Sequence, residues 1–279
     1  MSDELTALVS AWRESVDRVV DLAGDLGDEE LGRPTDLPGW SVQDVLAHVA
    51  AVESDLAGLP GASSGPTSPP RVEGPAGVTD PFTAYTEAGV RARRGRSAGE
   101  LLDELRTAAD VRSAQLRENP PTDPTGTPPR TPGRIEWDWR TLLRNRAVDV
   151  WMHEQDVRRA VGRPGGLDSA GAAVTLGSFA AAIPYVVGKR VAPPEGTTVG
   201  LEVDGPVPIS GAVRVGADGR ATLLPGSGVP ADADAVLRMS GETFAILCGG
   251  RRPPEEVDVE VGGDAELARR VAGAMAVTP

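Results

Sequence analysis

The chain has 279 residues, of which 40% are hydrophobic and 25% charged, and its formal net charge is -13. This balance excludes disorder throughout the chain, and the acidic excess argues against nucleic acid as a partner because it repels phosphate backbones. Cys248 is the only cysteine, which excludes an internal disulfide and a cysteine-based zinc site. The N-terminus is acidic and the apolar runs are well short of about 20 residues, so we expect a cytoplasmic protein outside the membrane.

Apolar residues that recur at three- and four-residue steps predict helices in the first part of the chain. Ser41 is expected to begin the second helix, because Asp44 three residues later completes a capping-box-like pair. With no strand pattern between them, these helices predict a helical bundle. They cover about residues 5–20, 41–56, 81–94, 97–116 and 137–161.

Two proline-rich segments, residues 60–80 and 120–132, interrupt the helical pattern. Long segments without regular structure inside a compact domain are usually functional or disordered. We therefore expect both segments to border the binding pocket and to set its specificity.

The pattern changes after about residue 167. An alanine-rich helix from Ser169 to Val187 precedes short β-like runs, a helix capped by Ser240, a strictly alternating run over Val257–Val261 and a last helix opened by Asp264. Helices and strands mixed in this order predict an α+β domain. We predict two domains, residues 1–166 and 167–279. The earlier β-like runs are Val199–Val203, Ala212–Val215, Ala221–Leu224 and Ala235–Met239.

The chain has only two histidines, His48 and His153, so any metal site or imidazole chemistry must use one or both. Asp149 precedes His153 by four residues on a predicted helix, which places a carboxylate and an imidazole side by side, where they can bind one ion. A His/His/Asp set would leave open coordination positions, as catalytic metal sites do. The same pattern also fits two other interpretations, in which a histidine is a hydrogen-bonded core residue or Asp149 and His153 form a simple ion pair.

Four segments resemble the mycothiol-dependent maleylpyruvate isomerase family. Residues 37–50, LPGWSVQDVLAHVA, resemble its PGW-[ST]-V-x-D-[LV]-x-x-H-[LV]-A signature, and the run from Arg146 through Asp149 and His153 to Asp156 is similar to its acidic-x-x-x-His-x-x-Asp helix. Residues 249–265 and the closing VTP resemble its C-terminal domain. The resemblance implies a DinB-like four-helix bundle followed by a small α+β domain similar to sterol carrier proteins.

The resemblance also implies a site. In the family, the residues matching His48, Asp149 and His153 bind a divalent metal, usually taken to be zinc, and mycothiol is the co-substrate. A metal with an open position lowers the pKa of a bound thiol, so that the thiolate can add to an electrophilic, unsaturated acid. Many members have Glu where this chain has Asp149, and the shorter side chain bears on metal affinity and identity. Asp156 either orients an imidazole or is an exposed helix carboxylate.

An anionic substrate would need a fixed cation, and Arg94 and Arg252 are the preferred candidates. Most of the other arginines near these positions are expected to be solvated surface charges; they are Arg91, Arg93, Arg96, Arg146 and Arg251. Cys248 lies in an apolar run and is expected to pack as a small hydrophobic residue, and Trp40 is expected to belong to the core.

Three functions stay open at this stage: an isomerase, an S-transferase that conjugates mycothiol to electrophiles, and a non-catalytic carrier of an apolar ligand. The predicted partners are a small electrophile and a low-molecular-weight thiol, without nucleic acid or membrane. The chain is expected to be a monomer or a homodimer.

Overall fold

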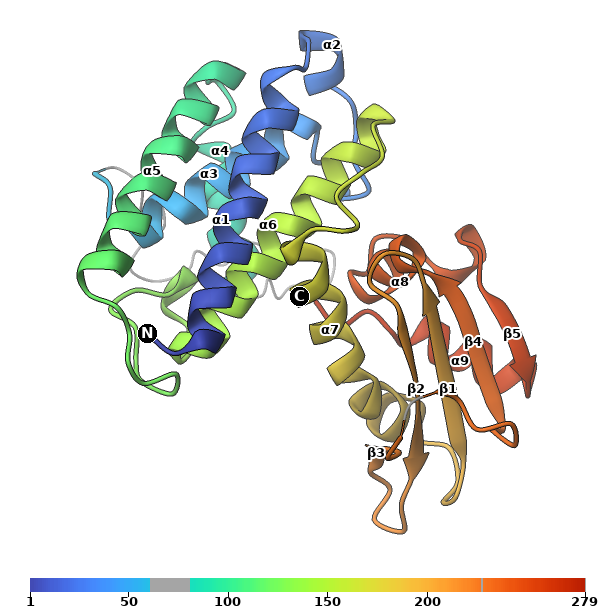
Figure 1. Ribbon diagram of the computed structural model, residues 1–279. Helices are drawn as coiled ribbons and strands as arrows, with labels where there is room; N and C mark the ends of the chain where they lie inside the picture. The colour runs from blue at the N-terminus through green and yellow to red at the C-terminus, as the bar shows by residue number, and fades with distance from the viewer. Residues whose placement is uncertain (61–80, 227, 279) are drawn as a thin grey trace. The chain divides into compact units, whose positions relative to one another are not determined.

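The computed structural model describes residues 1–60, 81–226 and 228–278. Its contacts divide the chain into two compact units, Met1–Pro164 and Gly165–Pro279 (Figure 1). Of the two predicted proline-rich segments, residues 60–80 lie outside the described residues except for Pro60, whereas residues 120–131 form turns and extended chain.

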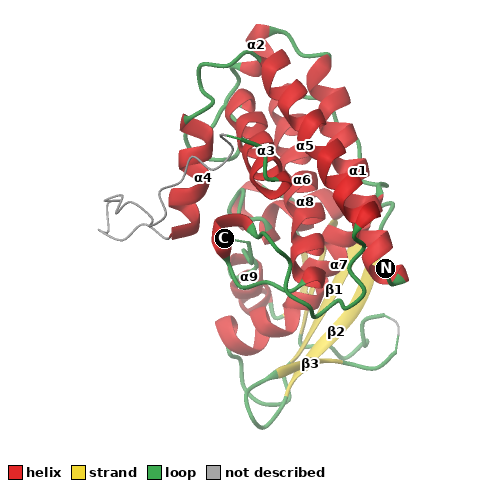
Figure 2. Cartoon of the chain, turned by 90° about the vertical axis from the view of Figure 1, so that its left-hand side faces the viewer, coloured by secondary structure: helices red, strands yellow, loops and turns green. Residues whose placement is uncertain are grey.

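The first unit is a helical bundle, as predicted. Helices α1, α3, α5 and α6 run side by side, and each packs against two of the others (Figures 1 and 2). Helix α4 packs against α3, and the short α2 is a helix that periodicity did not predict. The elements are α1 (Asp3–Gly24), α2 (Asp28–Leu31), α3 (Val42–Ala57), α4 (Pro81–Arg91), α5 (Ala98–Glu118), the 3₁₀ turn η1 (Pro132–Arg134) and α6 (Trp139–Val161).

Helix α3, which carries His48, begins at the predicted cap. The Ser41 hydroxyl accepts a hydrogen bond from the Asp44 backbone N–H at 3.2 Å, and the Asp44 carboxylate accepts one from the Ser41 N–H at 3.1 Å. The helix ends at Gly58, whose φ of 72° is the left-handed conformation that favours glycine. This double cap fixes both ends of the helix and therefore the depth at which His48 enters the bundle.

The second unit combines a mixed sheet with three α-helices, as the predicted α+β domain requires. The sheet has the order β3-β2-β1-β4-β5, in which β1 and β4 are parallel and the other neighbours antiparallel. The elements are α7 (Ala170–Tyr185), the π-helical η2 (Val186–Val191), β1 (Thr198–Asp204), β2 (Ile209–Val215), β3 (Ala221–Leu223), β4 (Ala235–Ser240), α8 (Gly241–Cys248), η3 (Pro254–Glu256), β5 (Glu260–Gly263) and α9 (Ala265–Gly273).

The two central strands of this sheet alternate in burial toward their C-terminal ends, whereas their first residues are buried on both faces. Leu201 of β1 pairs with Leu237 of β4 and both are buried, whereas the neighbouring pair of Glu202 and Arg238 is only half-buried. Because side chains alternate across a strand, one face of the sheet at this end belongs to the core and the other carries polar groups. Helices α7, α8 and α9 all contact the sheet.

The predicted strand over Val257–Val261 is wrong in its position. Pairing with β4 covers only Glu260–Gly263, and Pro254–Glu256 form a 3₁₀ turn. Beyond Arg238, β4 soon reaches Ser240, which caps α8, so the chain turns away before it could pair with residues 257–259. In the sequence Val257, Asp258 and Val259 alternate because the two valines are half-buried and the aspartate is exposed, although this stretch is not part of the β-ladder with β4.

The segment Ala170–Val191, which comprises α7 and η2, is long and apolar enough to cross a membrane, with a mean hydropathy of 1.6 over its most apolar window. Within that window, 44% is buried inside the protein. A single helix of this kind is a weak indication, because the core helix of a globular protein meets the same criterion.

Candidate metal centre

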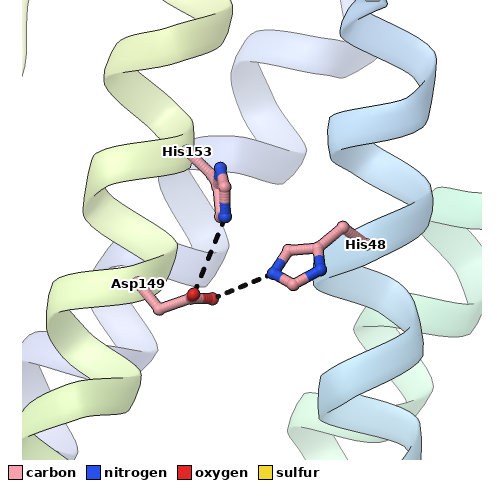
Figure 3. Close-up of side chains that lie close together, drawn as sticks. All are labelled: His48, Asp149 and His153. Atoms are coloured by element: carbon pink, nitrogen blue, oxygen red, sulfur yellow. Dashed lines mark ion pairs between the residues drawn. The ribbon is translucent and has the colours of Figure 1, made fainter. Parts of the chain in front are cut away.

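Two neighbouring bundle helices bring the three predicted ligands together (Figure 3). His48 projects from α3, and Asp149 and His153 project from successive turns of α6. The His48 Nε2 and Asp149 Oδ2 atoms are 3.6 Å apart, and the His153 Nε2 and Asp149 Oδ1 atoms are 3.7 Å apart. One donor atom from each residue lies within 4.8 Å of the others, so the three groups could hold a single cation.

The arrangement of these side chains suits metal coordination better than direct hydrogen bonds between them. Both ring nitrogens of His48 are buried without a hydrogen-bond partner among the described residues, and a separation of 3.6 Å from Asp149 is too long for a hydrogen bond. A buried polar group without a partner is costly, and structures retain such groups where they have a function. Two imidazoles and one carboxylate are ligands that zinc accepts, and they leave a coordination position open.

The protonation states that the site favours are also those of metal ligands. Burial lowers the pKa of His48, which keeps its imidazole neutral and its nitrogen lone pair available. Burial by itself would raise the pKa of Asp149, but the Arg146 guanidinium and the two imidazoles hold that pKa well below its ordinary value. The site therefore combines neutral His48 with ionised Asp149.

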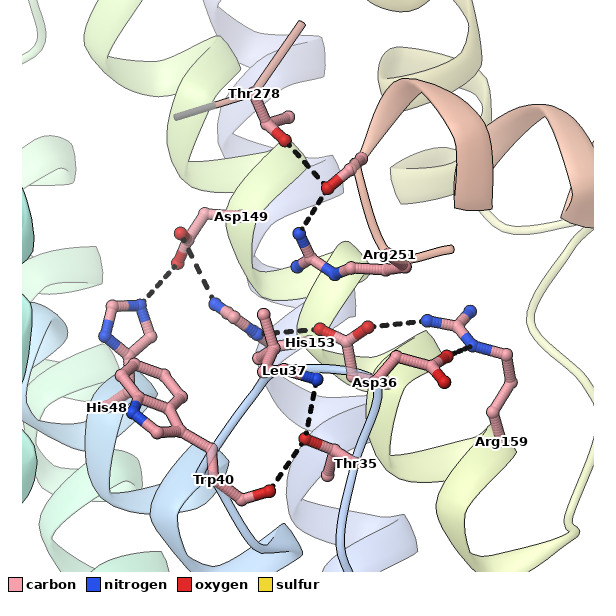
Figure 4. Close-up of polar contacts among 12 residues, drawn as sticks. Thr35, Asp36, Leu37, Trp40, His48, Asp149, His153, Arg159, Arg251 and Thr278 are labelled. Carbon is pink, nitrogen blue, oxygen red and sulfur yellow. Dashed lines mark hydrogen bonds and ion pairs between the residues drawn. The ribbon is translucent and has the colours of Figure 1, made fainter. Parts of the chain in front are cut away.

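A chain of polar contacts fixes the ring of His153 (Figure 4). Its Nδ1 lies 3.1 Å from Oδ2 of Asp156, a fully buried carboxylate. Asp156 in turn accepts a hydrogen bond from Arg159, whose Nε donates to Asp36 Oδ2 at 2.7 Å. A proton on Nδ1 shared with Asp156 leaves Nε2 directed at Asp149, which is the arrangement of a carboxylate that orients a metal-binding histidine. Asp156 is therefore not an exposed helix carboxylate.

Trp40 lies at the site, although its position in the sequence predicted only a core residue. Its ring centroid is 5.2 Å from that of His48 and 6.3 Å from that of His153, and the indole is half-buried (Figure 4). The indole N–H donates to Glu87 Oε1 of α4 at 2.7 Å. Trp40 thus forms an apolar side of the site that is anchored to a third helix, and only its place at the end of the PGW turn hinted at this.

The structure places the two candidate arginines differently. Arg94 is exposed and its Nε lies 2.9 Å from Asp44 Oδ1, one helical turn before His48 on α3. Arg252 belongs to the second unit, where it is half-buried between α8 and η3. Both remain candidates for contact with an anionic substrate.

Cys248 is fully buried at the end of α8, and burial raises the pKa of its thiol. A thiol held protonated and out of solvent is a poor nucleophile. We expect a thiol reagent at pH 8 to label no cysteine in the folded protein and one cysteine per chain in urea, measured by mass spectrometry. Stoichiometric labelling of the folded protein would contradict this assignment of Cys248 to the core.

Comparisons with known proteins agree with the geometry of the fold. The family model described as "Mycothiol maleylpyruvate isomerase N-terminal domain" matches residues 12–158, and the model for the C-terminal domain of the same family matches residues 173–270. The fold resembles crystal structures of mycothiol-dependent maleylpyruvate isomerase and of a histidine-to-alanine variant, each with 16% identity and a TM-score of 0.55 over 94% of this chain and 96% of the other. A search of curated proteins gives no significant match. The chain therefore belongs to the mycothiol maleylpyruvate isomerase family.

Proposed function

We propose that the protein is a metal-dependent enzyme that uses mycothiol to isomerise maleylpyruvate or a closely related unsaturated acid. The observation that carries the proposal is the convergence of His48, Asp149 and His153, with both His48 nitrogens unpartnered among the described residues, in a chain of this family. Zinc is the metal that the donor set fits best.

Each residue of the site has a distinct task in this proposal. A divalent metal held by His48, Asp149 and His153 would lower the pKa of a bound thiol, so that its thiolate forms at neutral pH. Asp156 keeps the His153 ring in the tautomer that presents Nε2. Trp40 shields one side of the site from water with its indole, which strengthens electrostatic interactions inside.

The protein need supply no nucleophile of its own. A bound mycothiol would supply a thiolate that can add to one alkene carbon of the substrate, which would move the π electron pair onto the conjugated carbonyl oxygen and leave a single bond about which the substrate can rotate. Return of that electron pair would expel the same thiolate and restore the double bond as the trans isomer, so atoms and charge balance. Arg94 and Arg252 are the proposed cations for the substrate carboxylates.

The test combines metal analysis with a thiol-dependence assay on the full-length protein. We expect about one zinc ion per chain, and turnover of maleylpyruvate that requires mycothiol and returns a product of unchanged mass. A stable thioether adduct would instead identify an S-transferase. Purified protein without metal, or turnover independent of thiol, would overturn the proposal.

A further inference from the structure

One guanidinium links the half-buried carboxylate of Asp149 to the fully buried carboxylate of Glu53. Arg146, one turn before Asp149 on α6, donates from Nη1 to Asp149 Oδ2 at 3.0 Å. The same guanidinium donates from Nε and Nη2 to Glu53 Oε1 at 3.0 and 2.8 Å. Glu53 lies on α3, the helix that carries His48.

Glu53 is itself held in place from a third helix. Its side chain is 0% exposed, and its Oε1 atom also accepts a hydrogen bond from the Trp12 indole of α1 at 3.0 Å. The Arg112 guanidinium of α5 stacks over the Trp12 ring, 5.5 Å from its centroid, and its Nε lies 3.9 Å from Glu53 Oε2. All four bundle helices therefore meet at Glu53, so its position is set by the packing of the bundle as a whole.

We propose that Arg146, fixed by Glu53, is a positioning residue that holds the Asp149 carboxylate at the orientation in which it binds the metal. The inference rests on the proposed function, because it requires a metal at this site. Oδ2 of Asp149 accepts the hydrogen bond from Arg146 and lies 3.6 Å from His48 Nε2, whereas Oδ1 lies 3.7 Å from His153 Nε2. The guanidinium is planar, and its rigid fork of donors cannot follow the carboxylate if it rotates.

The charge of Arg146 acts against this role, and Glu53 reduces that effect. A lone guanidinium 3.0 Å from the ligand oxygen would repel a divalent cation. Glu53 accepts hydrogen bonds from the other two nitrogens of Arg146 and opposes its positive charge, so the repulsion of a cation is weakened while the orientation of Asp149 is retained. The net effect of Arg146 on metal affinity is therefore favourable.

The test measures zinc affinity rather than turnover. In Arg146→Gln the fixed donor to Asp149 is lost, and we expect the zinc dissociation constant, measured by competition with a chelator, to rise about 10- to 100-fold. In Arg146→Lys the positive charge remains but the fork is lost, so the affinity should also fall. The visible spectrum of the cobalt-substituted variants should change, because it reports the geometry of the ligands.

Arg93 provides a matched control. Its side chain is 3% exposed, against 4% for Arg146, and it also binds a single glutamate, Glu104, with two nitrogens. Arg93→Gln should destabilise the fold in urea to a similar degree as Arg146→Gln and leave zinc affinity unchanged. If Arg146→Gln does not fold, Arg146→Lys is compared with Arg93→Lys in the same way.

The outcomes separate this inference from the proposed function. Wild-type affinity in the folded Arg146 variants would overturn the inference alone, as would an equal loss of affinity in the Arg93 control. A wild-type affinity in Arg146→Lys with a loss in Arg146→Gln would show that a flexible ammonium donor serves as well as the guanidinium, and it would overturn the positioning role of the rigid fork. Wild-type protein that binds no zinc would overturn both proposals.

Discussion

Replacing His48 by alanine is expected to reduce bound zinc from about one ion per chain to about none, and to remove mycothiol-dependent turnover with it. His48 is the only ligand that α3 supplies, so the two α6 residues that remain, Asp149 and His153, cannot enclose a cation alone. His153→Ala should have the same effect, because it leaves a single imidazole. Elemental analysis of the dialysed variants measures the loss, and circular dichroism shows whether the bundle remains helical.

Ser54 supplies the control for this experiment. It is fully buried on the same helix as His48, but its hydroxyl donates to Glu104 Oε1 of α5 at 2.7 Å, away from the metal ligands. Ser54→Ala should therefore retain the metal and the turnover while losing one buried hydrogen bond. A His48→Ala protein that keeps a full complement of zinc would refute the ligand assignment, and so would metal loss in Ser54→Ala.

The helices of the first unit were predictable because apolar residues recur at helical steps along their buried faces. Val42, Val45 and Val49 recur at helical steps and are all fully buried in α3, and the cap at Ser41 is where the capping box predicts it. The end of α7 was not predictable in the same way. The alanine-rich pattern predicts an α-helix to Val187, whereas Pro184 lacks a backbone donor near the point where the chain becomes π-helical, from Val186.

Only part of the predicted metal site could be inferred from the residues themselves. The four-residue step from Asp149 to His153 is local, so the pair could be seen in the sequence, but the approach of His48 depends on how α3 packs against α6. For that step the family resemblance was needed, and the two family models confirm the resemblance. That these residues bind a metal remains a prediction.

Glu53 was missed, although a signal was present. It falls on the same helical stripe as Val42, Val45, Val49 and Leu56, where only apolar residues are expected. A carboxylate at such a position must be paired inside the protein, since an isolated buried charge is too costly. The sequence could thus have predicted a buried ion pair, but not that Arg146 and Trp12 supply its partners.

Replacing Glu53 by leucine is expected to lower the free energy of unfolding by about 3–5 kcal/mol, measured with urea. The change removes the acceptor of Arg146 and Trp12 and leaves the guanidiniums of Arg146 and Arg112 buried with less compensation. Burial already lowers the pKa of Arg112 to about 10 although Glu53 opposes that shift, and the variant removes this opposing charge. In the triple variant Glu53→Leu/Arg112→Met/Arg146→Met most of the stability should return, because a well-packed apolar core can replace a buried ion cluster.

Glu154 is the matched control, because it is a second glutamate with no exposed surface, in α6. Its arginine partners, Arg18 and Arg158, have side chains that are 30% and 15% exposed, so water can solvate them when the carboxylate is removed. Burial raises the pKa of Glu154, so its charged form is already disfavoured and its removal should cost less than that of Glu53. Equal losses in Glu53→Leu and Glu154→Leu would show that burial of the carboxylate alone sets the cost. A larger loss in Glu53→Leu would instead trace the cost to the two arginines that it leaves inside the bundle.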